Sequence, residues 1–236
     1  MIKSNDILAI IPARSGSQRL QNKNILPIAG KPMIVYTIEQ ALLSRHLEEV
    51  FVSTDDQEVA DIAIRYGANV PFIRPKELSS NDATIFDVVK HAVEYLKNSG
   101  RFFKYVLLLQ PTSPLRESTH IDESIDLLEE RNADGIISVC NIDHPLQWVN
   151  NLPENKSMVG FLRHDLKSRR SQDYEKLYRL NGAIYIAKVG PLLHNNSFFL
   201  ESNIYAYVMD RLTSIDVDTD EDLLLASLLI EKRLSA

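Results

Sequence analysis

An unbroken apolar run from Ile7 to Ile11 is the feature that most constrains how this chain can fold. A strand covered by helices on both faces shows no alternation of apolar and polar residues, so such a run is typical of the centre of a parallel sheet. Pro12 follows at once and predicts the end of the strand. A second run of the same kind, Tyr105–Leu109, predicts a second central strand.

The rest of the chain alternates between segments with helical spacing of apolar residues and short apolar segments. This repetition predicts an α/β fold of three layers, in which a doubly wound, mostly parallel sheet lies between two layers of helices. The chain has 236 residues, and we expect residues 1–236 to form a single domain. The expected helices cover residues 33–43, 57–66, 85–96, 120–130 and 221–234; the expected strands cover 50–53, 135–140, 181–186 and 205–208, with an extended segment at 70–73.

Composition excludes several classes of protein. Hydrophobic residues make up 44% of the chain and charged residues 25%, ordinary globular values that argue against disorder or a coiled coil. The net charge of −6 does not suit a nucleic-acid-binding surface, so an anionic ligand would need a local positive site. No apolar stretch reaches the roughly 20 residues that cross a bilayer. The amino terminus has no signal-peptide pattern, so we expect a cytoplasmic protein.

The loop after the first predicted strand is rich in groups that bind phosphate. Cations, hydroxyls, amide groups and a glycine occur close together: Arg14, Ser15, Gly16, Ser17, Arg19, Lys23 and Asn24. Such groups can surround an anion at the carboxyl end of a strand, where α/β sheets bind their ligands. A solvated basic loop is the alternative. The dinucleotide-binding glycine pattern and the P-loop ending are both absent, so we do not expect a Rossmann dehydrogenase.

Residues 12–24 closely resemble the first motif of the cytidylyltransferases that activate sialic acids and related nonulosonic acids as CMP-sugars. A second stretch, Gln110–Arg116, resembles the Gln-Pro-Thr-Ser-Pro-Leu-Arg motif of the same family. The resemblance implies a fold like that of the nucleotide-diphospho-sugar transferases, with CTP as a substrate. It implies that Gln110 orients the sugar acid and that Arg116 supports the loop. It also implies nucleotide contacts from Ala13, Arg14, Ser15, Gly16, Lys23 and Asn24.

Residues 74–84 resemble the segment that reads cytosine and ribose in this family. The edge of a cytosine ring needs hydrogen-bond donors and acceptors, which Arg74 and a hydroxyl of Ser80 or Thr84 can supply. The family pattern is matched more loosely here, so the choice of hydroxyl stays open. Thr84 also stands where a helix N-cap is expected, which is the alternative for that residue.

Two later segments, 168–173 and 181–185, resemble the half of the site that binds the sugar acid. A guanidinium can bind the sugar carboxylate through two parallel hydrogen bonds, so Arg169 or Arg170 is a candidate, with Arg170 taken as the site residue. The resemblance implies further sugar contacts from Gln110, Asn181, Tyr185, Phe198 and Phe199. Two adjacent phenylalanines are otherwise usual in a core, which is the alternative for that pair.

Asp216 and Asp218 lie two residues apart in a segment that we expect to be extended. Alternate side chains of an extended segment point to the same face, so the two carboxylates can converge on one hard cation. They match an Asp-x-Asp pair of the family, and the resemblance implies that they hold Mg²⁺ against the triphosphate. Residues 220–222 are also acidic but open the last predicted helix, where its dipole favours negative charge.

Residues 141–180 interrupt the alternation of strands and helices. They are richer in Asn, Pro, Lys, Arg and Ser and have no long apolar helix stripe. A flexible surface excursion would explain such a composition. The family resemblance instead implies an inserted arm that forms a homodimer and completes the sugar site of the partner.

The resemblance implies a nucleotidyl transfer in which the anomeric hydroxyl oxygen of the sugar acid attacks the α-phosphate of CTP and pyrophosphate leaves. Arg14, Lys23 and Mg²⁺ would neutralise charge on the phosphates. None of the six histidines has a triad-like setting in the sequence. The base would therefore be a metal-bound hydroxide or a carboxylate such as Asp216.

The expected substrate is N-acetylneuraminic acid or a close analogue. Legionaminic acid is the alternative, because residues 168–173 and 181–185 look more like the sialic and legionaminic branch than like the pseudaminic acid or Kdo branches. A catalytically silent nucleotide-binding assembly protein is a rival from another class. It would not need the charged positions that only the chemistry requires, yet these are all present: Arg14, Lys23, Asp216 and Asp218.

Overall fold

Six strands form the main sheet, with bounds β1 Ile7–Pro12, β4 Val50–Ser53, β5 Tyr105–Leu109, β6 Gly135–Asn141, β7 Tyr178–Lys188 and β8 Ile204–Met209. Their order is β4-β1-β5-β7-β6-β8. β1 pairs in parallel with β4 and β5, and β6 with β8, whereas β7 runs antiparallel to β5 and β6. The computed structural model describes residues 2–16, 19–80, 82–142, 144, 146–162 and 175–235. The predicted mostly parallel α/β sheet is confirmed, with β7 as the reversed strand.

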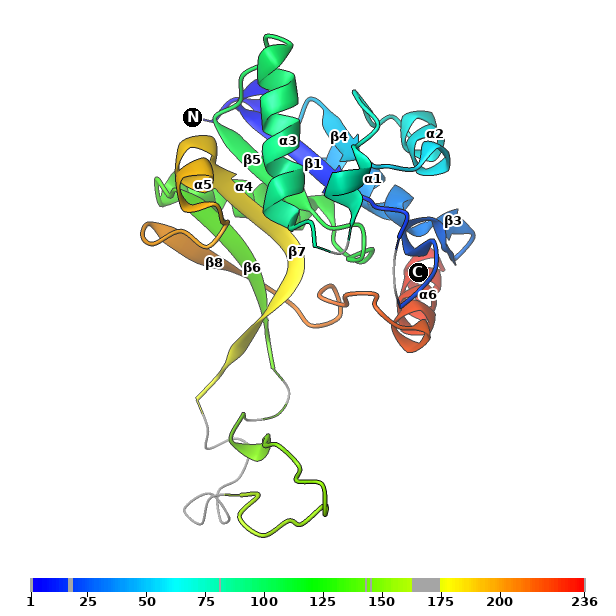
Figure 1. Cartoon of the computed structure of the whole chain (residues 1–236), viewed down its shortest axis with the longest axis vertical. Coiled ribbons are helices and arrows are strands. Elements are labelled where there is room, and N and C mark those ends of the chain that lie inside the picture. The colour runs from blue at the N-terminus through cyan, green and yellow to red at the C-terminus, as the bar shows by residue number, and fades with distance from the viewer. Residues whose placement is uncertain are drawn as a thin grey trace.

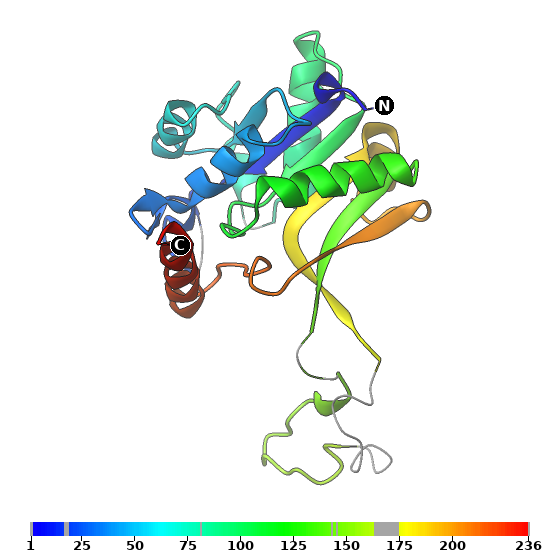
Figure 2. The same cartoon turned by 180° about the vertical axis from the view of Figure 1, so that it is seen from behind.

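Helices cover both faces of this sheet (Figures 1 and 2). Alternate residues of β1 divide between two cores: Ile7, Ala9 and Ile11 pack on one face, and Leu8 and Ile10 on the other. All five are at most 3% exposed, which explains the unbroken apolar run. The first core is shared with α1 Met33–Leu42, α2 Gln57–Arg65 and α4 Ser118–Glu130, and the second with α3 Ile85–Asn98 and α5 Val189–Asn195.

A third, smaller core joins a hairpin to the last helix. The hairpin pairs β2 Pro27–Ile28 with β3 Lys31–Pro32, and α6 Asp220–Leu234 packs against it through Ala226 and Ile230. Figure 1 shows the hairpin and α6 together at the same end of the molecule. The acidic residues 220–222 lie in the first turn of α6, as predicted. The helix begins with a capping box, in which Thr219 accepts the Asp222 backbone N–H.

Residues 70–73, which we expected to be extended, carry an isolated parallel bridge between Ile73 and Thr54 and form no strand. Two features differ from the predictions. The strand predicted at 181–186 begins earlier, at Tyr178. The α5 helix was not predicted; it has seven residues, too few to show a clear helical period.

The ribbon of β6 and β7 continues beyond the body of the molecule (Figure 1). Its outer pairs are Val139 with Leu180, Cys140 with Arg179 and Asn141 with Tyr178. We call residues 141–180, which this ribbon carries, the arm. Its described part contains the 3-10 turn η4 Leu146–Trp148 and lies away from the sheet (Figure 2).

Candidate active site

Loops from the carboxyl ends of β1 and β5 meet the segment before α3 around a pocket of about 300 Å³. This is the edge at which α/β sheets bind their ligands. Residues predicted separately to bind nucleotide or sugar therefore share one lining: Arg14, Lys23, Asn24, Arg74, Ser80, Thr84 and Gln110. Thr112 also lines the pocket and was not predicted as a site residue.

The first loop, residues 13–24, is anchored at both ends. The buried Ala13 donates its backbone N–H to the Ser53 carbonyl at 2.9 Å, which continues the pairing of β1 with β4. Asn24 is also buried and donates its side-chain amide to the Arg14 carbonyl at 2.9 Å. At Gly16 an added Cβ would meet no atom within 4 Å, so this glycine borders open space. Ser17 lies outside the described residues.

Ser15 is bound by a residue that the sequence reasoning missed. Asp55, just after β4, accepts the Ser15 backbone N–H at 3.0 Å and the Ser15 hydroxyl at 2.7 Å. Burial raises the pKa of Asp55, but the two hydrogen bonds from Ser15 and the nearby Arg74 charge outweigh it and leave the pKa below its ordinary value. The signal for Asp55 was its place after a strand, at the same sheet edge as the first loop.

Lys23 and Asp218 join the first loop to the segment before α6. The Lys23 ammonium donates to Asp218 Oδ1 at 2.7 Å, and Arg19 donates to Asp218 Oδ2 at 2.9 Å. The hydrogen bond from Lys23 is the main cause that lowers the pKa of Asp218 below its ordinary value. The two predicted catalytic groups are therefore in direct contact, and the carboxylate is held ionised.

Asp216 is the more buried of the two aspartates. Its Oδ1 is buried and has no hydrogen-bond partner among the described residues, while Thr112 is bonded to its carboxylate. Burial raises the pKa of Asp216, and the neighbouring Asp218 charge raises it further. An oxygen in this state can accept a cation or a proton.

The donor set fits the magnesium ion that the resemblance implies. Mg²⁺ in nucleotide sites is usually held by one or two carboxylates, with phosphate oxygens and water completing its shell. Asp216 and Asp218 would supply the carboxylates, and the unpartnered Oδ1 of Asp216 has capacity for a metal. No group of three or more metal-binding side chains occurs in the described part of the chain, so phosphates and water would have to complete the shell.

Arg74 also lines the first pocket, and its side chain is 3% exposed. Its Nε and Nη2 have no hydrogen-bond partner among the described residues, and burial lowers its pKa. Arg14 donates to the Ser80 carbonyl at 3.1 Å, which ties the first loop to this segment. Thr84 is the N-cap of α3: it accepts the Asp87 N–H at 3.2 Å, so the capping alternative is confirmed.

A second pocket, of about 290 Å³, continues from Gln110 and Thr84 toward α5. Tyr185, Phe198 and Phe199 line it, with the Tyr185 ring 5.8 Å from that of Phe198 and 6.4 Å from that of Phe199. Phe198 is 4% exposed and belongs to the core of this face, whereas Phe199 is 56% exposed. The core alternative therefore applies to Phe198, although both rings line the pocket.

Gly182 lies between Gln110, which is predicted to bind the sugar, and Asp216, which is predicted to bind the metal. Its φ is +76°, which a residue with a side chain adopts only with strain. A Cβ at this position would lie 3.5 Å from Gln110 Nε2 and 3.6 Å from Asp216 Oδ2. The glycine thus keeps open the space between Gln110 and Asp216.

Asn181 is 1% exposed and its side chain is engaged inside the protein. It accepts the Ser138 hydroxyl at 2.6 Å and the Ala183 N–H at 3.2 Å, and it donates to the Ser214 hydroxyl at 2.9 Å. These contacts tie β6, β7 and the segment before α6 together. A direct contact between Asn181 and the sugar stays a prediction, and Arg169 and Arg170 lie outside the described residues.

Arg116 supports the loop after β5 through hydrogen bonds from its buried guanidinium. Its guanidinium donates to the Gln110 carbonyl at 3.1 Å, to the Ala183 carbonyl at 2.8 Å and to the Thr37 hydroxyl at 2.7 Å. The residue is fully buried, and burial lowers its pKa to about 9. These contacts join the loop to α1 and β7, as the resemblance implied.

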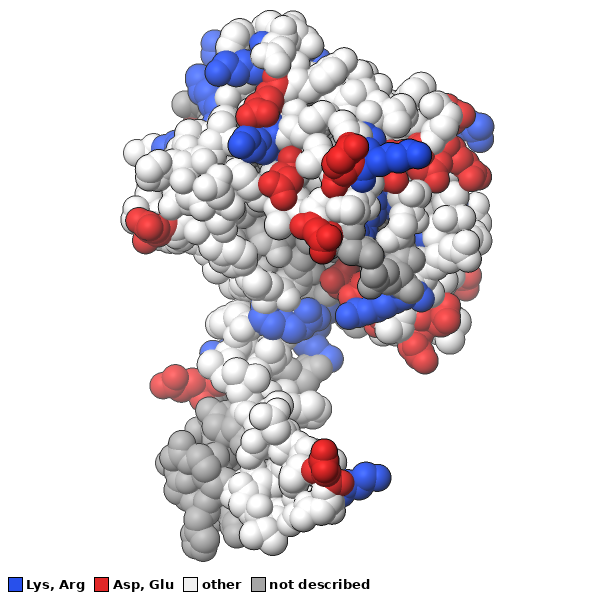
Figure 3. All heavy atoms as spheres, viewed as in Figure 1, with Lys and Arg blue, Asp and Glu red and all other residues white. Residues whose placement is uncertain are grey.

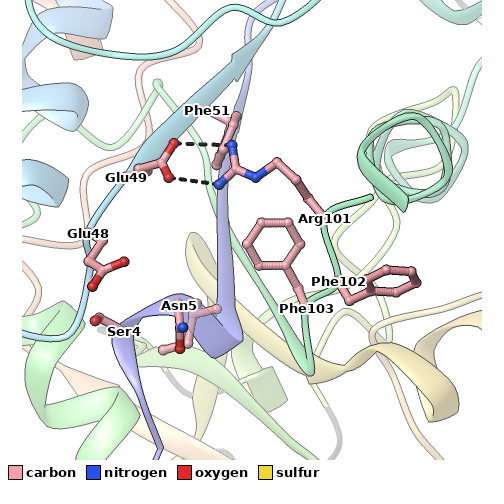
Figure 4. Close-up of a pocket in the computed structure, with 9 residues that line it drawn as sticks. Ser4, Asn5, Glu48, Glu49, Phe51, Arg101, Phe102 and Phe103 are labelled. Atoms are coloured by element: carbon pink, nitrogen blue, oxygen red, sulfur yellow. Dashed lines mark hydrogen bonds and ion pairs between the residues drawn. The ribbon is translucent and has the colours of Figure 1, made fainter. Parts of the chain in front are cut away.

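Another hollow, of about 190 Å³, lies at the opposite end of β1 and β5 (Figure 4). Its charged group Arg101 is paired with both carboxylate oxygens of Glu49, at 2.7 and 3.2 Å. The same guanidinium lies over the rings of Phe51 and Phe103. The Arg101 charge is therefore paired within the protein. The predicted phosphate-binding residues lie at the other edge of the sheet.

Within the described residues no helix is both long and apolar enough to cross a membrane.

The sequence matches a family model described as cytidylyltransferase over residues 8–233. It is 39% identical over 96% of its length to an N-acylneuraminate cytidylyltransferase of Escherichia coli O18:K1:H7, of which it covers 52%. It is 36% identical over 95% of its length to a CMP-N,N'-diacetyllegionaminic acid synthase of Legionella pneumophila, of which it covers 96%, and 35% identical over 94% to a pseudaminic acid cytidylyltransferase of Campylobacter jejuni, of which it covers 95%. The chain therefore spans about half the length of the E. coli relative and nearly all of the other two.

Two solved structures share the fold. CMP:2-keto-3-deoxy-manno-octonic acid synthetase complexed with CTP superposes with a TM-score of 0.70 at 22% identity, covering 96% of this chain and 99% of that one. A 4-diphosphocytidyl-2C-methyl-D-erythritol synthase from Anaerococcus prevotii superposes with a TM-score of 0.66 at 14% identity, covering 95% and 98%. These likenesses agree with the α/β fold, and the family model covers nearly the whole chain. The chain belongs to the cytidylyltransferase family.

Proposed function

We propose that this chain transfers the CMP group of CTP to the anomeric hydroxyl of a nonulosonic acid and releases pyrophosphate. The observation that carries this proposal is the meeting of Lys23, Asp216 and Asp218 at the edge of a pocket that Arg14 and Arg74 also reach. Cations for the phosphates and carboxylates for a metal ion are the groups that nucleotidyl transfer needs. The names of the 35–39% identical relatives support the same class of reaction.

The nucleotide half of the site would hold CTP with its phosphates toward the first loop. Lys23 and Arg14 would neutralise phosphate charge. Arg74 would meet a carbonyl or ring nitrogen of the base with Nε, which has no hydrogen-bond partner among the described residues. In the reaction the anomeric oxygen forms a bond to the α-phosphorus while the bond to the leaving pyrophosphate breaks. In-line positioning of that oxygen contributes most of what the protein must do.

Magnesium, when bound by Asp216 and Asp218, supplies neutralisation of the triphosphate charge. Asp218, which accepts from Lys23 in this structure, would hold the metal together with Asp216, and the Lys23 ammonium would neutralise a phosphate oxygen. Asp216, with its buried and unpartnered Oδ1, lies ready to bind without breaking a hydrogen bond. Lys23 would thus pair with a substrate phosphate when the substrate is bound and with the Asp218 carboxylate when it is not.

The sugar acid would lie against Gln110, Tyr185 and Phe199 in the second pocket. Gly182 leaves room for the reacting end of the sugar between Gln110 and Asp216. The sugar carboxylate would pair with Arg169 or Arg170 of the arm, because a guanidinium matches a carboxylate with two parallel bonds.

The arm would form a homodimer. In its described part, large apolar side chains face solvent, among them Val149 at 66%, Met158 at 61% and Val159 at 94% exposure. Figure 3 shows few charged atoms over this part of the arm. An apolar patch of this kind on a protruding element marks an interaction surface. Sedimentation of Val159→Glu should show a loss of dimer, while Phe102→Glu, at a position 71% exposed outside the arm, should leave the dimer intact.

The identity of the sugar is tested by competition. N-acetylneuraminic acid, legionaminic acid, pseudaminic acid and Kdo would be offered together with CTP and Mg²⁺, and the CMP-sugars separated by mass. We propose that N-acetylneuraminic or legionaminic acid forms the main product, N-acetylneuraminic acid being favoured by the 39% identical relative. A main product from pseudaminic acid or Kdo would overturn the choice of sugar but keep the reaction. No product from any sugar would favour the catalytically silent nucleotide-binding protein.

A further inference from the structure

Asp55 contacts the two segments that the proposed function assigns to the nucleotide. Its carboxylate accepts both hydrogen-bond donors of Ser15 in the first loop, at 3.0 and 2.7 Å. Oδ1 also lies 3.6 Å from Arg74 Nη2, within ion-pair distance. The Asp55 side chain is 14% exposed, so these contacts are poorly screened by solvent. One carboxylate therefore links the phosphate-binding loop to the segment that begins at Arg74.

The backbone reinforces this link. The Arg74 N–H donates to the Thr54 carbonyl at 2.7 Å, so Arg74 and Asp55 are held by adjacent peptide units. Asp55 is also the counter-charge in a positive region. Burial lowers the pKa of Arg74, the nearby Asp55 charge opposes this, and repulsion from Arg14 lowers the pKa further. A buried guanidinium that loses its carboxylate is costly, and the structure around it shifts to restore solvation.

The geometry also defines what Ser15 does. Its hydroxyl and its backbone N–H both donate to Asp55, so neither is directed at a ligand. The neighbouring residues are different: Arg14 and Lys23 line the pocket, and Gly16 borders open space. Ser15 thus fastens the loop while its neighbours face the nucleotide.

We propose that Asp55 is a positioning residue for nucleotide binding, which fixes the first loop through Ser15 and orients Arg74 in the lining of the same pocket. This inference rests on the proposed function, because it concerns the same site. It assigns no direct phosphate contact to Ser15. Asp55 acts on the nucleotide through Arg74 and through the loop cations next to Ser15.

The neighbouring Asp56 offers a matched control. It is the N-cap of α2 and accepts the Glu58 N–H at 2.7 Å, with no hydrogen bond or ion pair to the described residues of the first loop. Asp55→Asn keeps the size of the side chain but removes the charge and one of the two acceptors for Ser15. We expect it to raise the Kd for CTP with Mg²⁺ by on the order of tenfold to a hundredfold, as for other residues that orient binding groups. Asp56→Asn keeps an oxygen that can cap α2, so it should leave both the melting temperature and the Kd close to the wild-type values. Equal CTP affinity in Asp55→Asn and the wild type would overturn the proposal.

A double-mutant cycle tests the path through Ser15. Ser15→Ala should weaken CTP binding in the wild type but cause no further loss when combined with Asp55→Asn, since both remove the same link. If the two fold-changes multiply instead, Ser15 contacts the nucleotide directly and the assigned path is wrong.

Calorimetric titration of CTP and a pyrophosphate assay of the same preparations separate the two proposals. A wild-type chain that binds CTP but releases no pyrophosphate with any sugar contradicts the reaction and leaves the Asp55 comparison valid. A wild-type chain that binds no CTP contradicts both. Unchanged binding in Asp55→Asn beside an active wild type contradicts the role of Asp55 alone.

Discussion

Lys23 and Asp218 are 195 residues apart in the chain, yet the lysine ammonium donates a 2.7 Å hydrogen bond to the carboxylate. Arg19 holds the second oxygen of the same carboxylate at 2.9 Å. This contact brings the first loop against the segment that opens α6, at the edge of the nucleotide pocket. The cations and the carboxylate that the proposed nucleotidyl transfer needs are therefore in direct contact in this structure.

Replacement of Asp218 by Asn should weaken the response to magnesium. The amide retains the shape of the carboxylate but cannot neutralise a cation, so the Mg²⁺ concentration for half-maximal activity should rise by about tenfold or more. Asp220→Asn, in the exposed first turn of α6, is the matched control and should behave as the wild type. A magnesium titration of pyrophosphate release compares them; equal midpoints for Asp218→Asn and the wild type would show that Asp218 does not hold the metal.

Asp216→Asn should stabilise the metal-free protein while removing activity. Burial disfavours the ionised form of Asp216, and its Oδ1 has no partner among the described residues. Relief of a buried unpaired group is worth about 1–3 kcal/mol, and each kcal/mol moves the Tm of a domain this size by about 2–4 °C. We expect a Tm higher by about 2–12 °C in a chelator-treated melt. Asp222→Ala, which removes the acceptor for the Thr219 backbone N–H in the capping box of α6, should lower the Tm instead. A lower Tm in Asp216→Asn would contradict this account.

Gly182→Ala should damage the site beyond its effect on folding. The positive φ imposes a strain of about 1–2 kcal/mol on any L-residue. The new methyl group would also lie 3.5 Å from Gln110 Nε2 and reduce the space for the sugar, so kcat/KM should fall by about tenfold or more. Gly100→Ala shares the positive φ but meets no atom within 4 Å, so it should lose similar stability and keep full activity. Equal activities of the two variants would show that Gly182 is not part of the sugar site.

The ion pair of Asp134 with Lys188 should give a pH-dependent part of the stability. The Lys188 ammonium, 2.6 Å away, lowers the pKa of Asp134 below its ordinary value of 3.8. Because the folded-state pKa is the lower one, the stabilisation is present above 3.8 and is lost as the pH falls through the folded value. Asp134→Asn should cost about 0.5–1 kcal/mol at neutral pH, and the difference from the wild type should shrink as the pH falls below 3.8. Urea unfolding at several pH values measures the free energy of unfolding of both proteins. A difference that persists in acid would show that packing, not the ion pair, causes it.

The central strands and the charged loops could be predicted from sequence because each has a strong local signal. β1 and β5 are apolar without interruption, since both faces are covered, and the loops that follow them must share one edge of a parallel sheet. Asp216 and Asp218 carry the two-residue spacing of an extended segment. The direction of β7 has no such signal, because an apolar run such as Ala183–Ala187 reads the same in parallel and antiparallel strands.

The remaining site residues depend on contacts between distant segments. Asp55 is one acidic residue in an ordinary strand-to-helix turn, and its role follows from the distance to Ser15, 40 positions away. The positive φ of Gly182 arises inside a strand, where a glycine usually indicates only a bulge. The same dependence applies to Asn181, whose side chain proved to be enclosed by Ser138 and Ser214.

Pyrophosphate release tests the central claim most directly. The wild type, Lys23→Ala and the control Lys232→Ala, at a charged position in the last turn of α6, would each be incubated with CTP, Mg²⁺ and either N-acetylneuraminic or legionaminic acid. We predict release by the wild type and by Lys232→Ala with at least one of the sugars, and a loss of at least about a hundredfold in Lys23→Ala. Undiminished release in Lys23→Ala, or none in the wild type with either sugar, would contradict the account.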